Sequence, residues 1–480
     1  MSDRITPASF VDALIPVIFL AVALFTSVNF YGEDSSYGPN QIALIFSACV
    51  ALLIGLKNGH SWRELEGGIY EGMSVVFAPS FILLAVGMMI ATWIVGGVVP
   101  SMIYYGLQLM NPSIFYAASC VVCAIISLSI GSSWTTAASV GVALIGTAIG
   151  LGLSVEITAG AIISGAYFGD KMSPLSDTTN LAPAVANVDL FSHIRHMVWT
   201  GVPSLAIAII LFLIIGLFAE PVVNPGELQL TLDTLSNSFT IAWYMLLPLV
   251  ALLALAWKKM PALPAILIAA FIGAIYAVIF QTQNVIDLVG ESEQNNVLMM
   301  LKALWTLAVS GYEANTNNVI LDDLLSGGGA ANMLNTIWLI LCAVFFGGAM
   351  ERTGLLRELI EAILSRAKST SAMITSTILT CIGTNIITGD QYIAIVLPGR
   401  MYKAAFHNKG LAPVNLSRAI EDSATVTSPL VPWNTCGAFM AASLGVATFA
   451  YLPFCFFNLI MPVISIFYGV INFKILPLEE

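Results

Sequence analysis

Residues 85–106 read AVGMMIATWIVGGVVPSMIYYG and lie within a segment, Gly72 to Val155, that contains no Asp, Glu, Lys, Arg or His. A helix needs ~20 apolar residues to span ~30 Å of hydrocarbon, so this segment is long enough for several crossings. A second segment of the same kind extends from Ser423 to Phe473. Because backbone polar groups in lipid must be satisfied within the protein, both segments are expected to fold into several helices or protein-buried loops.

The composition of the whole chain agrees with a membrane protein. Charged residues make up 9% of 480 residues, against roughly 25% in soluble proteins, and the mean hydropathy is +0.89. Shorter apolar runs predict single spans at about 14–30, 40–56, 197–219, 239–257, 261–281, 334–350 and 371–388. We predict an all-α polytopic membrane protein with roughly 11 to 14 membrane-embedded helices, some of them broken or forming re-entrant hairpins.

The charge and cysteine content exclude other classes of protein. The 17 basic residues and the net charge of −11 leave no basic surface for nucleic acid, so membrane lipid is the expected surrounding partner. All seven cysteines lie in apolar stretches, which argues against a disulfide framework.

The distribution of basic residues orients the predicted helices, because loops rich in Lys and Arg stay in the cytoplasm. The loops in question carry Lys57 and Arg63; His193, Arg195 and His196; Lys258 and Lys259; and Arg352, Arg357, Arg366 and Lys368. The loops between them carry acids such as Asp34 and Asp233. This alternation predicts a multi-pass protein with a cytoplasmic N-terminus.

Two parts of the chain resemble each other in the order and spacing of their motifs. Residues 130–136 (IGSSWTT) parallel residues 382–388 (IGTNIIT), and Ser173-Pro174-Leu175 recurs farther on as Ser428-Pro429-Leu430. The helix that opens the first copy is expected to run outward and the helix that opens the second copy inward. Equivalent elements of opposite direction form an inverted-topology repeat, which places a substrate site near the membrane midplane between broken helices.

This repeat divides the chain into four parts. We predict an N-terminal two-helix segment (1–72), a first repeat (73–218), connecting helices and loops (219–333) and a second repeat (334–480).

The first polar cluster interrupts an apolar region at residues 170–180, which read DKMSPLSDTTN. Pro174 breaks the helix and frees backbone carbonyl groups beside side-chain oxygens. Carboxylate, hydroxyl, amide and carbonyl oxygens are the ligands that a small, hard cation prefers. The alternative interpretation is an ordinary cytoplasmic turn in which Asp170 and Lys171 are solvated.

The second copy contains a matching cluster. Residues 383–391 read GTNIITGDQ, and residues 421–435 place Glu421 and Asp422 ahead of another Ser-Pro break. An ionisable residue inside a membrane is costly and is therefore a functional candidate, and protons and cations compete for such acids. Asp390 and Asp177 are the preferred candidates, because Asp422 has a second interpretation as an acid stabilised by a helix dipole.

The predicted site therefore draws on both copies. The predicted ion-binding and proton-coupling residues are the acids Asp170, Asp177, Asp390 and Asp422, together with Ser132, Ser133, Thr135, Ser173, Thr178, Asn180, Thr384, Asn385, Thr388, Ser428, Asn434 and Thr435. The residues predicted to bind Na⁺ directly are Asp177, Asn180, Asn385, Asp390 and Thr435.

Several of these motifs resemble the NhaC-type sodium/proton antiporter family of the ion-transporter superfamily. The matching stretches are 165–183 (GAYFGDKMSPLSDTTNLAP), 347–351 (GGAME), 389–392 (GDQY), 397–400 (LPGR), 421–430 (EDSATVTSPL) and 432–437 (PWNTCG). One stretch departs from the pattern, since family members often read LLSRGG where residues 325–329 read LSGGG. The role of that arginine, including an anion contact, does not carry over to this chain.

The resemblance implies exchange of Na⁺ for H⁺ across the inner membrane of a bacterium, by a homodimer whose moving transport unit contains inverted repeats and hairpin tips. It equally implies the alternative of Na⁺ and H⁺ exchange coupled to an organic acid such as malate and lactate. A Na⁺-coupled amino-acid transporter is a further alternative.

Other functional classes lack their motifs. The sequence contains no H-E-x-x-H, no G-x-S-x-G and no G-x-x-x-x-G-K-[ST], so we expect neither an enzyme nor an ATP-driven pump. Transport is expected to be driven by ion gradients, with no cofactor.

Overall fold

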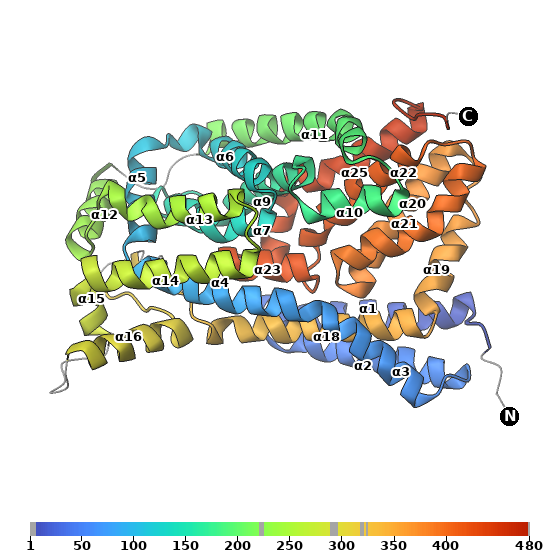
Figure 1. The fold of residues 1–480 in the computed structure, drawn as a ribbon, viewed down its shortest axis with the longest axis horizontal. Helices are drawn as coiled ribbons and strands as arrows, with labels where there is room; N and C mark the ends of the chain where they lie inside the picture. The colour runs from blue at the N-terminus through green and yellow to red at the C-terminus, as the bar shows by residue number, and fades with distance from the viewer. Residues whose placement is uncertain (1–5, 220–224, 289–295, 317–320, 323–324, 479–480) are drawn as a thin grey trace.

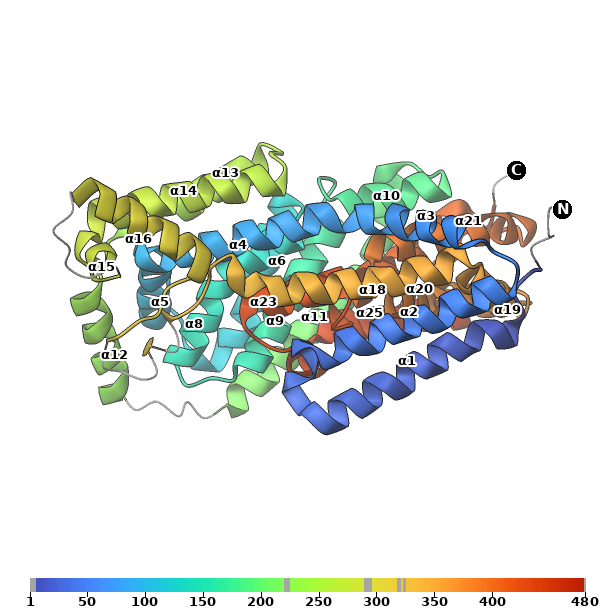
Figure 2. The ribbon, with the colours of Figure 1, turned by 90° about the horizontal axis from the view of Figure 1, so that it is seen from below.

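The computed structural model describes residues 6–219, 225–288, 296–316, 321–322 and 325–478. Within these ranges, nine helices are long and apolar enough to cross a membrane, and two bent helix pairs raise the number to as many as eleven. Both chain ends lie at the same end of the molecule (Figures 1 and 2). The predicted all-α polytopic membrane fold is confirmed.

The N-terminal helices form a layer beside the second repeat. This layer consists of α1 (Phe10–Tyr31), α2 (Pro39–Lys57), α3 (Trp62–Met73) and α4 (Phe77–Val95). Helix α5 (Val98–Leu109), which with α4 opens the predicted first repeat (73–218), packs instead against residues 142–150. Helices α2 and α3 pack along α18 (Leu334–Arg352), as Figure 1 shows. Segments far apart in the sequence therefore build one framework.

The connecting helices gather at the end opposite to the termini (Figure 2). They are α12 (Pro225–Ser238), α13 (Leu247–Trp257), α14 (Ala262–Phe280), α15 (Thr282–Asp287) and α16 (Asn296–Ser310). Helix α14 packs along α4. The single span expected at 239–257 is instead part of a pair, Leu228–Ser238 and Trp243–Trp257, that bends by 84°.

The first repeat contains a hairpin and a broken helix. Its elements are α6 (Phe115–Ile130), α7 (Ser133–Thr136), the π-helical turn η4 (Ala137–Gly141), α8 (Val142–Gly150), α9 (Val155–Met172), α10 (Asp177–Ala186) and α11 (Leu190–Phe218). Gly165 and Gly169 let α9 approach the backbone of α6 so closely that a Cβ at either position would overlap it. His193 and His196, assigned to a cytoplasmic loop by the sequence, lie buried in α11 because that helix begins earlier than expected.

The predicted second repeat (334–480) begins with α18, and the elements that follow it include a hairpin and a broken helix like those of the first repeat. The elements after α18 are α19 (Leu355–Leu364), α20 (Thr370–Thr388), α21 (Gln391–Asn408), α22 (Pro413–Ile420), the π-helical turn η7 (Glu421–Thr425), η8 (Ser428–Leu430), α23 (Thr435–Leu444), α24 (Thr448–Tyr451) and α25 (Phe456–Ile471). A hairpin, α20 and α21, is again followed by a helix interrupted at a Ser-Pro pair.

The two hairpins turn in the same way. Gly131 (φ 71°) ends α6 and Gly389 (φ 65°) ends α20, both in the left-handed conformation that favours glycine. The next residue, Ser132 or Asp390, caps the following helix with its side chain. The equivalent of Gly131 is therefore Gly389, and the sequence alignment with Gly383 was wrong, because Gly383 lies inside α20.

Candidate functional site

The tip of the first hairpin is attached to α9 by a carboxylate. Asp170 Oδ2 accepts hydrogen bonds from the backbone N–H of Ser133 at 3.1 Å and from its hydroxyl at 2.6 Å. Ser132 Oγ accepts from the backbone N–H of Thr135 at 3.2 Å and lies 3.0 Å from the Thr135 hydroxyl. The other oxygen of the buried Asp170 carboxylate, Oδ1, has no hydrogen-bond partner among the described residues.

The break between α9 and α10 is stabilised by its own polar side chains. Thr179 Oγ1 donates to the carbonyl oxygens of Asp170 at 3.1 Å and Lys171 at 2.9 Å, which lie at the end of α9. Asn180 Nδ2 donates to the carbonyl oxygen of Pro174 at 3.0 Å. Ser173 Oγ accepts from the N–H of Leu175, and the Thr178 hydroxyl lies 3.1 Å from that of Ser176. Most of the freed backbone groups are thus satisfied, and the oxygens of these side chains remain directed at the break.

The tip of the second hairpin also places a buried carboxylate. Asp390 Oδ1 accepts from the backbone N–H of Ile393 at 2.9 Å, whereas Oδ2 lacks a hydrogen-bond partner in the described part of the chain. The carbonyl oxygen of Gly389 accepts from the N–H of Thr435 at 2.8 Å. Thr384 and Thr388 donate along α20 to the carbonyl oxygens one turn earlier. A hydrogen bond therefore joins the second hairpin tip to the second helix break. The hydrogen bonds between Ser133 and Asp170 join the first tip to the first break in the same way.

Asn385 connects three elements around that second break. Its Nδ2 donates to the carbonyl oxygen of Ala424 at 2.6 Å and to Thr427 Oγ1 at 3.1 Å, and its Oδ1 accepts from Asn434 Nδ2 at 3.1 Å. Ser428 Oγ donates to the carbonyl oxygen of Thr425 at 2.7 Å. These amides and hydroxyls are buried, so the break is a polar centre enclosed by apolar helices.

The two repeats meet through their hairpins. The Trp134 ring stacks on Phe439 of α23, with ring centroids 4.1 Å apart and planes inclined by 14°. The Tyr392 hydroxyl donates to the carboxylate of Asp177, which is exposed at the start of α10. Of the predicted Na⁺ ligands, Asp177 and Asn180 lie at the first break, and the structure brings the other three together at the second tip.

A cavity of about 440 Å³ adjoins the first tip and the first break. Its polar lining consists of Ser132, Thr135, Asp177, Asn180 and Lys259. A separate cavity of about 290 Å³ lies between the first repeat, α4, α5 and the end of α23, and its lining includes Ser443 and Gly445. The larger cavity therefore adjoins the polar centre, whereas the smaller one has a mostly apolar lining that contains no residue of the tips or the breaks.

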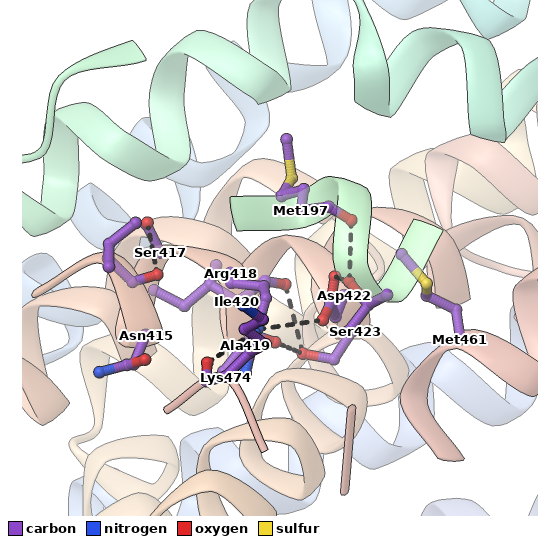
Figure 3. Close-up of polar contacts among 12 residues, drawn as sticks. Met197, Asn415, Ser417, Arg418, Ala419, Ile420, Asp422, Ser423, Met461 and Lys474 are labelled. Atoms are coloured by element: carbon purple, nitrogen blue, oxygen red, sulfur yellow. Dashed lines mark hydrogen bonds and ion pairs between the residues drawn. The ribbon is translucent and has the colours of Figure 1, made fainter. Parts of the chain in front are cut away.

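A buried ion pair joins the repeats between the two tips. Lys171 Nζ of α9 lies 2.5 Å from Asp422 Oδ1 of η7, and both side chains are fully buried. The same Oδ1 accepts from the Thr200 hydroxyl at 3.1 Å, and Arg418 Nε lies 3.9 Å from Oδ2 (Figure 3). Arg418 also donates from Nη1 to the carbonyl oxygen of Lys474 at 3.1 Å. The alternative interpretation, a cytoplasmic turn in which Lys171 is solvated, is therefore wrong, because the Lys171 side chain is fully buried.

Comparison with known proteins agrees with this geometry. The sequence model described as the Na⁺/H⁺ antiporter family matches residues 165–473, which include both breaks and both carboxylates. The chain belongs to the Na⁺/H⁺ antiporter family. This antiporter is 36% identical over 89% of both chains to the Na⁺/H⁺ antiporter NhaC of Alkalihalophilus pseudofirmus.

Other relatives of this antiporter bear different names. The malate-2H⁺/Na⁺-lactate antiporter of Bacillus subtilis is 35% identical over 98% of this chain and 96% of its own. The arginine/ornithine antiporter ArcD of Halobacterium salinarum is 33% identical over 97% of this chain and 93% of its own.

The sequence analysis did not predict three buried residues of the antiporter's centre as site residues: Lys171, Arg418 and Glu421. A basic residue within an apolar stretch was the available signal for Lys171. The carboxylate of Glu421 is fully buried, and neither of its oxygens has a hydrogen-bond partner among the described residues. The predicted ligand Asp422 is instead occupied by Lys171 and Thr200.

Proposed function

We propose that this Na⁺/H⁺ antiporter works by alternating access, with Na⁺ and protons competing for the buried carboxylates around the two hairpin tips. The observation that carries this proposal is a pair of oxygens in two buried side chains, Asp170 Oδ1 and Asp390 Oδ2, which have no hydrogen-bond partner in the part of the chain that the structure describes. A buried charge that nothing neutralises is costly, so the charge of each carboxylate is expected to be neutralised by a proton or a cation bound at it or beside it.

The neighbouring oxygens suit Na⁺ at both tips. At the first tip we assign Asp170 with Ser132, Ser133, Ser173 and Thr178. At the second tip we assign Asp390 with Asn385, Thr388, Asn434 and Thr435. Carboxylate, amide and hydroxyl oxygens are ligands for hard cations, and the left-handed glycine at each tip brings carbonyl oxygens to the same place.

Asp177 has a different position, which gives it a different proposed role. It is exposed, it lines the 440 Å³ cavity with Asn180, and it accepts from Tyr392 of the second repeat. We assign it to the entrance of the first site, where its charge attracts cations before they lose their hydration water.

The test of exchange is reconstitution of the full chain in liposomes that enclose a pH-sensitive dye. Addition of Na⁺ outside vesicles with an acidic interior should raise the internal pH, and the response should saturate with Na⁺. Vesicles that show no Na⁺-dependent pH change, despite correctly inserted protein, would contradict the proposed exchange.

A second candidate function rests on the size of the 440 Å³ cavity. Small-molecule sites occupy about 300–1,000 Å³, and this cavity presents both a carboxylate, Asp177, and an ammonium group, Lys259. An organic acid or an amino acid coupled to Na⁺ is the substrate class that this lining fits. Repeating the vesicle assay with malate, lactate, arginine or ornithine separates the candidates, since a strict Na⁺/H⁺ exchanger responds to none of them.

We further propose that the antiporter resides in the bacterial inner membrane with a cytoplasmic N-terminus, and that it forms a homodimer. The basic turns at Lys57 and at Lys258 support this orientation. Exchange of ions requires neither a cofactor nor an enzymatic reaction, and we propose none.

A further inference from the structure

Glu421 and Asp422 are adjacent in η7, but their environments differ. Asp422 has Lys171 and Thr200 at one oxygen and Arg418 at 3.9 Å from the other. Glu421 is equally buried, yet neither of its oxygens has a hydrogen-bond partner in the described part of the chain. The close-up in Figure 3 shows that Arg418 is directed at Asp422. Lys171 and Arg418 therefore lie closest to Asp422, and Glu421 forms no ion pair with the residues that the structure describes.

Every element packed against η7 presents few titratable groups to Glu421. Asp170 and Lys171 from α9 and Cys381 from α20 interact with Glu421. Arg418 from α22 interacts with Asp422 and with Tyr468 from α25, and the hydroxyl of Tyr402 from α21 lies 2.8 Å from that of Thr380. Helix α10 presents the Thr178 hydroxyl and η7 the Thr425 hydroxyl, and both lie close to Glu421 without forming a hydrogen bond of good geometry. Glu421 therefore lies in the same buried polar cluster as Asp170, the carboxylate of the first hairpin site.

The formal charges of this centre leave room for one monovalent cation. Two cations, Lys171 and Arg418, face three carboxylates, Asp170, Glu421 and Asp422, and all five side chains are buried. The group carries one net negative charge when all of its members are ionised. A net charge enclosed in apolar surroundings is costly, and binding one proton or one Na⁺ removes it.

We propose that Glu421 carries the exchanged proton of the first site and releases it when Na⁺ binds at Asp170. The hydrogen bonds of Asp170 and Glu421 decide which of these two carboxylates is assigned the proton. Ser133 donates twice to Asp170, which stabilises its ionised form, whereas Glu421 receives no such bond among the described residues. The inference rests on the Na⁺/H⁺ exchange proposed above and assigns its proton to a specific side chain.

The location of η7 supports a coupling role. A π-helical turn is uncommon and often marks a functional position, and this one lies between α22 and the second helix break. Glu421 therefore belongs to the second repeat, while its partner Asp170 belongs to the first. One proton should leave for each Na⁺ that enters this site, because both ions neutralise the same net charge.

The experiment compares the wild-type antiporter with Glu421→Gln, which keeps the shape of the side chain but cannot release a proton. Na⁺-driven proton flux in liposomes should fall about tenfold or more, because the neutral side chain no longer exchanges its proton. In detergent, addition of Na⁺ to weakly buffered wild-type protein should release protons. The variant should release fewer than half as many, and it should bind radioactive Na⁺ at least tenfold more weakly, because its buried centre has no net negative charge left for Na⁺ to neutralise.

The matched control is Glu361→Gln on α19, an exposed glutamate whose pair with Arg357 faces solvent. It should leave flux and proton release unchanged. Glu421→Asp is a second variant, which retains a carboxylate and should exchange with a shifted pH dependence even where Glu421→Gln aggregates. Wild-type-like flux and proton release in Glu421→Gln, or an unshifted pH profile in Glu421→Asp, would overturn the inference. Loss of exchange in the wild type would instead contradict the proposed function itself.

Discussion

Lys171 and Asp422 form an ion pair in which both side chains are fully buried, and the two residues come from different repeats. Removing one partner of such a pair strands the other charge in apolar surroundings. We expect Lys171→Met to lower the free energy of unfolding by about 3–5 kcal/mol, whereas Lys171→Met with Asp422→Asn should recover most of that loss. Thermal unfolding in detergent measures both effects.

The control for this pair is the surface ion pair between Lys57 and Asp12. Lys57 is 67% exposed, so Lys57→Met should cost less than about 1 kcal/mol. A double variant at positions 171 and 422 that is no more stable than the single variant would show that Lys171 acts by packing and not by charge.

The acids at the two ends of the polar centre should differ in their kinetic effects. Asp390→Asn removes a buried carboxylate at the second tip and should abolish exchange at every Na⁺ concentration. Asp177→Asn alters an exposed group at the cavity entrance, so it should raise the Na⁺ concentration for half-maximal flux about tenfold, equivalent to ~1.4 kcal/mol of binding. Vesicle flux over a range of Na⁺ concentrations distinguishes the two outcomes, and the exposed Asp233→Asn should change neither.

At the scale of elements, each hairpin turns on one glycine that tolerates no side chain. A Cβ at Gly131 would lie 2.7 Å from the backbone of Leu175, and a Cβ at Gly389 would lie 2.8 Å from the Ala343 side chain. We expect Gly131→Ala and Gly389→Ala to cost about 1–3 kcal/mol beyond the strain of a left-handed alanine. Both should also reduce exchange, because the tips move away from the helix breaks.

Gly410→Ala isolates the strain alone. Gly410 has a similar φ of 66°, but a Cβ there would meet nothing within 4 Å. Its measured loss of thermal stability should therefore be the smallest of the three. Equal losses of thermal stability in Gly131→Ala, Gly389→Ala and Gly410→Ala would mean that close packing at the tips does not contribute to stability.

Helices and helix breaks were predictable from the sequence only where features of the local chain determine them. Apolar runs gave the helices, and the recurring Ser-Pro pairs gave both breaks, because proline interrupts a helix wherever it cannot be accommodated. The turn at Gly389 was misplaced because the similarity of residues 382–388 to 130–136 competed with the capping pattern Gly-Asp. The pairing of Lys171 with Asp422 could not be predicted, since it depends on how two distant repeats pack.

At the scale of the whole molecule, two cavities have linings that share no residue and that lie next to turns of different charge. Lys259, in the turn between α13 and α14, lines the larger cavity, whereas Ser36 and Tyr37, in the turn between α1 and α2, line a pocket that shares Gly327 and Gly328 with the smaller cavity. The first turn carries Lys258 and Lys259 and the second carries Asp34. By the positive-inside rule, the 440 Å³ cavity should open to the cytoplasm and the 290 Å³ cavity to the outside.

Alternating access makes these two cavities mutually dependent, and single cysteines can report on them. In a Cys49→Ser background, in which the six remaining cysteines are buried, Ala256→Cys lines the larger cavity and Ala442→Cys the smaller one. A membrane-impermeant thiol reagent should modify Ala256→Cys about tenfold faster from the cytoplasmic side and Ala442→Cys about tenfold faster from the outside, because the buried centre separates them. Changing the Na⁺ concentration should raise one rate while it lowers the other, since a single equilibrium between two conformations governs both. Rates that rise together, or modification of both cysteines from one side, would contradict a carrier in which the two repeats open in turn.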